Sequence, residues 1–428
     1  MKKISRIKTF LKKLGPGFIT GAADDDPSGI ATCSQTGAQF GFGQLWTPLL
    51  MLPMLIAVQE TCARIGTCKA KGLTYIISHY YNKKIAAICV LLLLIANIIN
   101  IGADIGSMAA AAQLIFPVNF TILIFAFVIF ITMAQIFIGY KKYASFLKWL
   151  CLTMFAYPIT IFIVNAPFLE ILKSTFIPHI EFNYQFLFLI TGIFGTTISP
   201  YMFFWDAVQE SEEDHARGLV KKDGHVNVKT KDIRRIQLDN VVGMVLSQIT
   251  TWSIIVVAAT VLHAHHITDV KTAADAAKML EPLVGNFPQA GLIAKIIFAT
   301  GIIGLGLIAV PVLSGSCAYA VCAILNYQSG LNLKFKSAKI FYCIILIATA
   351  IGVLINYIGI DPMKALVYSA VINGVLAVPL LFMIILIGRN EKIMGQHKSG
   401  VLSQTFMWIT FFCMFISAVS MFFTFGKG

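Results

Sequence analysis

Long apolar stretches constrain this chain more than any other feature, because each is long enough for the roughly 20 residues that a helix needs to cross a bilayer. Eleven can be traced, near residues 16–40, 44–63, 85–114, 119–139, 145–165, 184–210, 238–262, 291–325, 338–358, 362–387 and 401–425. Hydrophobic residues make up 57% of the chain and charged residues only 12%, which does not suit a soluble domain. The sequence therefore predicts an all-α polytopic membrane protein with one transmembrane domain over residues 1–428.

The net charge of +13 could indicate a nucleic-acid partner, but its placement argues against one. If the N-terminus is cytoplasmic, most of the 33 lysines and arginines fall in loops and helix ends on the cytoplasmic side. This is the bias of the positive-inside rule, so membrane topology accounts for the charge. We expect a plasma-membrane protein with its N-terminus inside and its C-terminus outside. Apart from the lipid bilayer, the sequence indicates no obligatory protein partner, no nucleic acid and no cofactor.

Two of the apolar stretches are interrupted. The first contains Asp26-Pro27-Ser28-Gly29, and the sixth contains Thr196-Thr197-Ile198-Ser199-Pro200-Tyr201. A proline in a membrane helix frees backbone carbonyls that hydrocarbon cannot solvate, so such a break persists only where protein, water or an ion satisfies them. The first break also carries a carboxylate. This combination predicts a cation site at mid-membrane depth.

The two interrupted stretches begin five spans apart, which predicts an internal repeat. If each copy holds five helices, the odd number forces the copies into opposite membrane orientations, giving a 5+5 inverted repeat. The first repeat would cover about residues 15–165 and the second about 184–387, with 401–425 as a peripheral eleventh helix. In such an architecture the substrate site lies between the repeats, and one bundle rocks against the rest to alternate access.

Short motifs then lie in a recognisable order on these spans. In the first span, Gly15-Pro16-Gly17-Phe18 is similar to Gly-Pro-Gly-Phe, and Asp26-Pro27-Ser28-Gly29 is similar to Asp-Pro-Gly-Asn. At the end of the second span, Ala63-Arg64-Ile65-Gly66 is similar to Ala-Arg-Leu-Gly. In the sixth span, the segment 195–201 is similar to Gly-Ala-Thr-Val-Met-Pro-His. The set resembles the Nramp family of divalent-metal transporters along most of the chain. The resemblance implies a LeuT-type fold, a transported divalent metal ion as the substrate, and no enzymatic activity.

The resemblance also implies a metal site, matched position by position. Asp26 takes the place of the metal-binding aspartate, and Gly29 that of the asparagine. Thr196 takes the place of an alanine whose carbonyl coordinates the metal, and Ser199 that of the methionine. Two of these four positions have changed chemistry, whereas the aspartate and the backbone carbonyl carry over.

The changed positions alter the expected choice of metal. A thioether favours later transition metals, so a serine hydroxyl at position 199 removes the main reason to prefer Mn²⁺ or Fe²⁺. Glycine at position 29 enlarges the cavity, and a roomier all-oxygen site suits Mg²⁺, which keeps several of its waters. We therefore expect a hydrated hard cation, with Mg²⁺ first and Mn²⁺ second. The alternative is a proton-coupled Mn²⁺ or Fe²⁺ symporter.

Proton coupling is doubtful on the same grounds. Tyr201 replaces the histidine of the family, and a tyrosine with an ordinary pKa near ~10 is a poor proton carrier at neutral pH. Asp104 matches a family aspartate, but Ser107 stands where a glutamate is expected. Uniport is sufficient, because a divalent ion gains ~4.6 kcal/mol from a potential of about 100 mV, on the order of a thousandfold accumulation.

Further polar residues are pathway candidates. Asp25 could line the entry path or pair with a basic residue. Asp104 and Asn373 could face the pathway or bond a neighbouring helix. An amino-acid or organic-cation carrier, a channel, or an intramembrane aspartyl protease built on Asp26 and Asp104 are weaker alternatives. The protease lacks its usual Gly-x-Gly-Asp motif, because Asp104 follows Gly102-Ala103.

Overall fold

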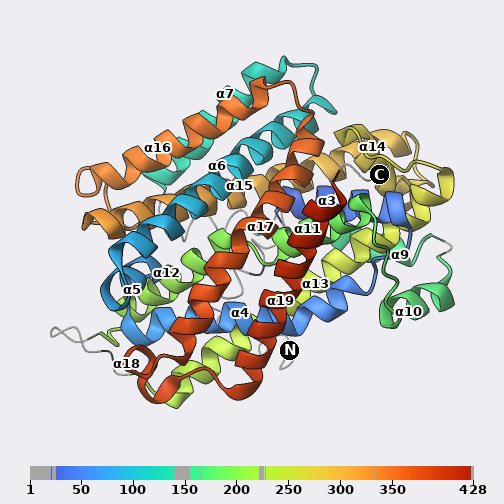
Figure 1. The fold of residues 1–428 in the computed structure, drawn as a ribbon. Coiled ribbons are helices and arrows are strands. Elements are labelled where there is room, and N and C mark those ends of the chain that lie inside the picture. The colour runs from blue at the N-terminus through green and yellow to red at the C-terminus, as the bar shows by residue number, and fades with distance from the viewer. Residues whose placement is uncertain are drawn as a thin grey trace, which may run out of the picture.

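The computed structural model describes residues 21, 26–138, 155–164, 166–220, 226, 228–331 and 333–425, which form an almost wholly helical protein (Figure 1). The membrane-spanning and shorter α-helices are α3 (Pro27–Phe40), α4 (Thr47–Lys69), α5 (Leu73–Tyr80), α6 (Lys83–Gln113), α7 (Phe120–Phe137), α9 (Ala156–Ile161), α10 (Phe168–Phe176), α11 (Tyr184–Thr197), α12 (Pro200–Ala216), α13 (Thr230–Val261), α14 (Ala273–Ala277), α15 (Ala290–Leu325), α16 (Lys339–Leu354), α17 (Pro362–Arg389), α18 (Glu391–Met394) and α19 (Val401–Thr424).

Nine helical segments of the described chain are long and apolar enough to cross a membrane. They correspond to the second to fourth and the sixth to eleventh of the predicted stretches, and α11 with α12 forms a single interrupted span. Of the first stretch the structure describes Gly21 and then Asp26 onward, where α3 follows, and of the fifth only the end, as α9. The predicted all-helical, multi-pass architecture is therefore confirmed.

The long helices pack in two groups. The helices α6, α7, α15 and α16 contact one another and run side by side (Figure 1). The helices α3, α4, α11, α12 and α13 form the second group, in which α3 packs on α11 and α13, and α4 packs on α12 and α13. α17 contacts α3, α4 and α11 as well as α6, so it lies between the groups.

Glycines permit the closest helix crossing beside the break in the sixth span. A methyl group on Gly195 of α11 would overlap the carbonyl oxygen of Ala370 and the backbone of Gly374, both on α17. Conversely, a methyl group on Gly374 would overlap the backbone of Thr191. The backbones of α11 and α17 thus touch directly, which brings polar residues of α17 near the end of α11.

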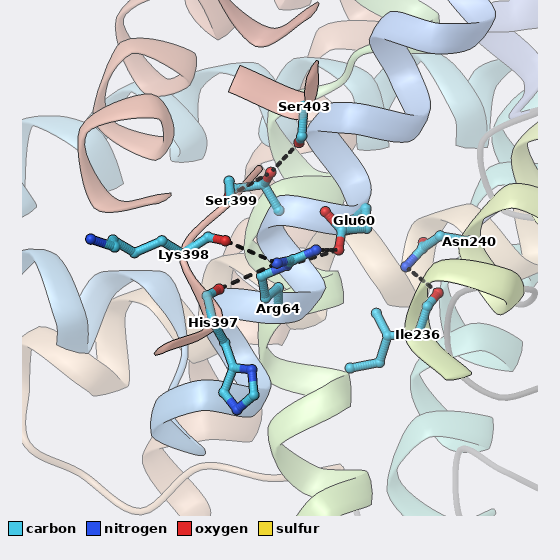
Figure 2. Close-up of polar contacts among 9 residues, drawn as sticks. Glu60, Arg64, Ile236, Asn240, His397, Lys398, Ser399 and Ser403 are labelled. Carbon is cyan, nitrogen blue, oxygen red and sulfur yellow. Dashed lines mark hydrogen bonds and ion pairs between the residues drawn. The ribbon is translucent and has the colours of Figure 1, made fainter. Parts of the chain in front are cut away.

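The eleventh span, α19, lies on the outside of the bundle against α4, α11 and α17. The segment that leads into it is held to α4 by a buried arginine. Arg64 pairs with Glu60 one turn earlier and also donates hydrogen bonds to the carbonyls of His397 and Lys398, at 3.3 and 3.1 Å (Figure 2). Because Arg64 lies in the Ala-Arg-Ile-Gly motif, part of that motif holds the segment that leads into α19.

Candidate functional site

The break in the sixth span follows from Pro200. A proline has no N–H to donate to the carbonyl four residues earlier and pushes its predecessor out of the helical region. α11 accordingly ends at Thr197, Ser199 is extended with φ −81° and ψ 139°, and α12 begins at Pro200. The Ser199 hydroxyl donates to the carbonyls of Thr196, at 2.8 Å, and Gly195, at 2.6 Å. Ser199 therefore satisfies the carbonyl that Pro200 leaves without a partner.

Asp26 lies immediately before α3 in the first span. Its backbone is extended, with φ −71° and ψ 172°, and its side chain caps α3 by accepting the backbone N–H of Gly29 at 3.0 Å. The hydroxyl of Ser28 donates to the same carboxylate oxygen at 2.5 Å. Proline at the first helical position suits this start, because its missing N–H would have no partner there. Asp26 is thus a helix cap whose carboxylate is only 1% exposed.

The two breaks meet at this carboxylate. The hydroxyls of Ser28 and Thr196 lie 3.0 Å apart, and the Thr196 hydroxyl donates to Asp26 Oδ1 at 3.4 Å. All three side chains are buried. The carboxylate, hydroxyls from both interrupted spans and the end of α11 therefore form one polar cluster inside the membrane domain.

A third helix, α6, completes the cluster through Asn100. Its side-chain Nδ2 donates to Asp26 Oδ2 at 3.0 Å and to Asp104 Oδ2 at 3.3 Å. Its Oδ1 accepts from the hydroxyl of Ser369, at 2.9 Å, and from Asn373 Nδ2, at 3.4 Å, both on α17. Asn100 thereby links the carboxylates of α3 and α6 to the polar side chains of α17.

The structure brings together most of the residues singled out from the sequence. Asp26 contacts Gly29 and Thr196, and Ser199 bonds the Thr196 carbonyl. Asp104 and Asn373 join through Asn100. Tyr201 is buried in the first turn of α12, where its carbonyl accepts a hydrogen bond from Ser316 of α15 at 3.3 Å. Asp25 lies outside the described residues.

Sequence reasoning missed Asn100 and Ser369. A signal for the first existed, because Asn97, Asn100, Asp104 and Ser107 recur every three or four residues in the apolar span α6 and so share a face. All four are buried. Polar residues at that spacing in a membrane helix face the protein interior. Ser369 gave no such signal, because isolated serines are common in membrane helices.

The cluster is rich in oxygen and contains two carboxyl groups. Among the described residues, no lysine, arginine or histidine forms an ion pair with Asp26 or Asp104, and Asp104 Oδ1 has no hydrogen-bond partner. Nor does the described part of the chain gather three or more His, Cys, Asp or Glu side chains into a metal-ligand group. A site with two carboxylates, hydroxyls, an amide and a helix-end carbonyl suits a hard cation better than a soft one.

A polytopic helical membrane protein whose interrupted helices converge on a buried polar site belongs to the class of secondary transporters. Comparison with known proteins specifies the family. The sequence model described as "Nramp: Natural resistance-associated macrophage protein-like" matches residues 17–424, so the chain belongs to the Nramp family. This confirms the resemblance seen in the motifs. Because the family consists of transporters, the chain is not an enzyme, and the intramembrane protease alternative is removed.

Curated relatives are distant but cover much of the chain. The divalent metal cation transporter MntH of Caldanaerobacter subterraneus subsp. tengcongensis is 24% identical over 421 residues, which is 94% of this chain and 92% of that protein. The protein of the same name from Staphylococcus haemolyticus is 28% identical over 229 residues, covering 52% of this chain and 51% of that protein. The chain is similar to the first of these proteins along nearly its whole length and to the second along about half of it.

Solved structures agree on the fold. A crystal structure of the Eremococcus coleocola manganese transporter, in complex with an aromatic bis-isothiourea substituted compound, has a TM-score of 0.74 at 16% identity and covers 99% of this chain and 90% of that chain. Mhp1, a nucleobase-cation-symport-1 family transporter, has a TM-score of 0.55 at 11% identity, with 97% and 94% covered. The predicted LeuT-type fold is therefore confirmed in its overall form.

Proposed function

We propose that this protein carries a divalent metal cation across the plasma membrane by alternating access. One observation carries the proposal: the breaks of two spans meet at Asp26, whose carboxylate lies within hydrogen-bonding distance of Thr196. The cluster is sealed from solvent, since Asp26, Asn100 and Thr196 are each at most 2% exposed. An ion can enter or leave only if helices move, as a carrier requires.

The proposed ligands come from both interrupted spans. Asp26 supplies a carboxylate, Thr196 its main-chain carbonyl, and Ser199 its hydroxyl, while the backbone N–H of Gly29 bonds the Asp26 carboxylate at 3.0 Å. Ser199 already bonds the Thr196 carbonyl, so the two oxygens lie together. Each carbonyl oxygen has a second lone pair, and a hydroxyl that donates still has lone pairs to offer.

The oxygen chemistry of the cluster favours a hard ion, so we place Mg²⁺ first and Mn²⁺ second. The side chain at position 199 is a hydroxyl engaged with main-chain oxygens, and it brings no thioether of its own. Mg²⁺ prefers oxygen ligands and holds its waters tightly. Carboxylate, amide and hydroxyl groups can bind such waters as readily as they bind the ion.

The packing supports a 5+5 inverted repeat of about residues 15–165 and 184–387, with 401–425 as the peripheral eleventh helix. Corresponding spans of the two halves lie together: α3 and α4 pack with the interrupted span α11–α12 and with α13, and α6 and α7 pack with α15 and α16. The charge distribution supports a cytoplasmic N-terminus and an external C-terminus. One group of helices would then rock against the other around the site.

We further propose that transport needs no proton. Asp25, Asp104, Tyr201 and Asn373 are the pathway candidates, and none is a histidine. Two carboxylates that share no described basic partner are neutralised by one divalent ion, so the membrane potential acts on the ion's full charge. About 2.3 kcal/mol per charge per 100 mV is sufficient to drive accumulation.

A proton-coupled Mn²⁺ or Fe²⁺ symporter is the second candidate. The name of the Eremococcus coleocola protein, a manganese transporter, favours Mn²⁺ as a substrate here too. Asp104, buried and with one oxygen lacking a partner, is the residue that could take up a proton. The two candidates differ in the ion preferred and in proton movement.

Uptake by purified protein in liposomes separates them. We expect Mg²⁺ uptake, inhibition of Mn²⁺ uptake by excess Mg²⁺, and no change in internal pH. Asp26→Ala should abolish uptake, because the remaining ligands are neutral. Mn²⁺ uptake that excess Mg²⁺ leaves unaffected would defeat the hard-ion proposal, and a carrier in which Asp26→Ala is fully active would defeat the site.

A further inference from the structure

Asn100 occupies the centre of the cluster, although no ligand position assigned above includes it. It lies in α6, in the group of helices opposite the one that holds Asp26, and it is fully buried. All four hydrogen-bonding positions described for its amide are directed at polar side chains from three helices. A residue with this arrangement either holds the helices together by hydrogen bonds or takes part in cation binding. The chemistry of its partners distinguishes these two roles.

On one side, the amide nitrogen faces negative charge. Nδ2 lies 3.0 Å from Asp26 Oδ2 and 3.3 Å from Asp104 Oδ2. When both carboxyl groups are ionised, a neutral N–H₂ group offsets only part of their repulsion. Asp104 Oδ1 also lacks any hydrogen-bond partner. The space that the amide nitrogen occupies is therefore one where a cation would be more stable than the N–H group.

On the other side, the partners of the amide oxygen can reverse their roles. The Ser369 hydroxyl donates to Asn100 Oδ1 at 2.9 Å but can equally accept a hydrogen bond. Asn373 donates through Nδ2 at 3.4 Å, and its own Oδ1 is buried without a partner. If both amides turned over, Asn100 Nδ2 could donate to Ser369 Oγ and to Asn373 Oδ1. Side-chain amides have a broad, roughly two-fold terminal torsion, so this turn meets little intrinsic barrier.

We propose that Asn100 is a ligand of the transported cation: its amide turns over when the ion binds, and Oδ1 faces the ion or one of its waters between Asp26 and Asp104. The inference rests on the transport function proposed above. The Asn100 side chain would supply an amide oxygen that Gly29 lacks. Residue 29 has little room for a side chain of its own, since a Cβ there would lie 3.3 Å from the Thr196 hydroxyl.

The arrangement has a consequence for movement. Asp26 belongs to the group of α3, α4, α11, α12 and α13, whereas Asn100 and Asp104 belong to α6. An ion held by both sides would draw the two groups together around itself. When the Asn100 amide turns over, its hydrogen bonds with Ser369 and Asn373 also change. Ion binding would thereby affect α17, the helix between the groups.

The test compares Asn100→Leu with Asn100→Asp in the full-length protein. Aspartate keeps an oxygen ligand but loses the N–H₂ donor, whereas leucine loses both. We expect Asn100→Leu to raise the apparent KM for Mg²⁺ uptake about tenfold or more, in the range seen when groups that support a metal site are removed. Asn100→Asp should keep the KM within a few-fold of the wild-type value.

Asn97→Leu is the matched control. Asn97 lies one turn away on α6, is equally buried, and donates to the Leu313 carbonyl of α15 at 3.0 Å. Its loss should lower the unfolding temperature and leave the KM unchanged. If Asn100→Asp is as impaired as Asn100→Leu, or if Asn97→Leu raises the KM equally, Asn100 is a structural donor and the inference is overturned.

A binding readout keeps this result separate from transport. MgCl₂ should raise the unfolding temperature of the detergent-purified wild type and of Asn100→Asp, and raise it far less for Asn100→Leu. If MgCl₂ raises the unfolding temperature of the wild-type protein but no uptake is measured, the proposed transport function is wrong and the assignment of Asn100 as a ligand is unaffected. Uptake that depends on Asp26 with a normal KM in Asn100→Leu would sink only the ligand assignment.

Discussion

The hydroxyl oxygens of Ser28 and Thr196 lie 3.0 Å apart, although 168 positions separate the two residues in the chain. They come from the two interrupted spans, and Asp26 Oδ1 accepts a hydrogen bond from each. Small hydroxyl side chains allow the breaks to approach this closely. The contact therefore fixes where the carboxylate stands relative to the end of α11.

The contact between Ser28 and Thr196 limits which side chain residue 29 can hold. We predict that Gly29→Asn strongly impairs uptake, because its Cβ would lie only 3.3 Å from the Thr196 hydroxyl and the side chain would need space beyond it. Thr196→Ala alone should reduce stability by about 1 kcal/mol through lost hydrogen bonds and leave the main-chain carbonyl in place. The double variant should recover activity relative to Gly29→Asn. Uptake kinetics of the four proteins form a double-mutant cycle.

One outcome of the double-mutant cycle would contradict the prediction. Strictly additive effects of Gly29→Asn and Thr196→Ala would mean that the two side chains do not share space in the working protein. Unfolding temperatures, measured on the same preparations, show whether any loss of uptake reflects lost folding.

Ser199→Met tests ligand softness. The Ser199 hydroxyl bonds the carbonyls of Gly195 and Thr196, and methionine would replace it with a polarizable thioether. We expect the ratio of Mn²⁺ to Mg²⁺ uptake to rise, because soft ligands favour the later metal. Ser199→Ala is the control, since it removes the hydroxyl without adding sulfur. An unchanged ratio in Ser199→Met would remove the argument from ligand chemistry.

Much of this arrangement was accessible from sequence, for reasons that are local. Pro27 and Pro200 mark their breaks because proline has no N–H to donate to the carbonyl four residues earlier. Proline alone is not sufficient, since Pro53, Pro311 and Pro379 lie inside continuous helices, so the neighbouring polar residues are part of the signal. Asp26 was identifiable because a carboxylate at such a break needs a partner. These inferences required only neighbouring residues.

The role of Asn100 was harder to predict from the sequence, because it depends on which residues of other helices lie near it. Its periodicity with Asp104 places both on one face of α6, but only the packing of α6 and α17 brings Ser369 and Asn373 to its amide. Likewise, nothing near Arg64 in the sequence predicts its hydrogen bonds to His397 and Lys398, more than 300 positions later. Register between helices decides such contacts, and spacing along one helix does not.

Transport should respond to voltage and leave pH unchanged. Within the described chain, neither Asp26 nor Asp104 has a basic partner, and Tyr201 is not a histidine. Each ion should therefore carry both of its charges inward. A negative-inside potential of about 100 mV should support accumulation on the order of a thousandfold, measured with a potassium–valinomycin gradient. Internal acidification that keeps step with metal uptake would contradict the prediction.

The ion pair between Glu60 and Arg64 should matter for stability and not for binding. Arg64→Ala leaves a buried carboxylate and two carbonyls without their donor, and such a loss typically costs about 3–5 kcal/mol. We expect a lower unfolding temperature in detergent and an unchanged KM in the protein that remains folded. Replacing both residues, as Glu60→Gln with Arg64→Met, should be milder. A raised KM with normal stability would instead connect this pair to the transport cycle.

The close crossing of α11 and α17 gives the sharpest packing prediction. A methyl group on Gly195 would overlap the backbone of Ala370 and Gly374, and backbone cannot turn aside as a side chain can. Gly195→Ala should therefore separate the two helices, pull the Thr196 carbonyl and hydroxyl away from Asp26, and abolish uptake along with much of the folded yield. Gly285→Ala is the control, because a methyl group there meets only atoms 3.6 Å or more away, in a backbone with φ −56°. Size-exclusion profiles and uptake measured on both variants would decide the matter: an active, well-folded Gly195→Ala protein would show that the end of α11 does not need this contact to position the site.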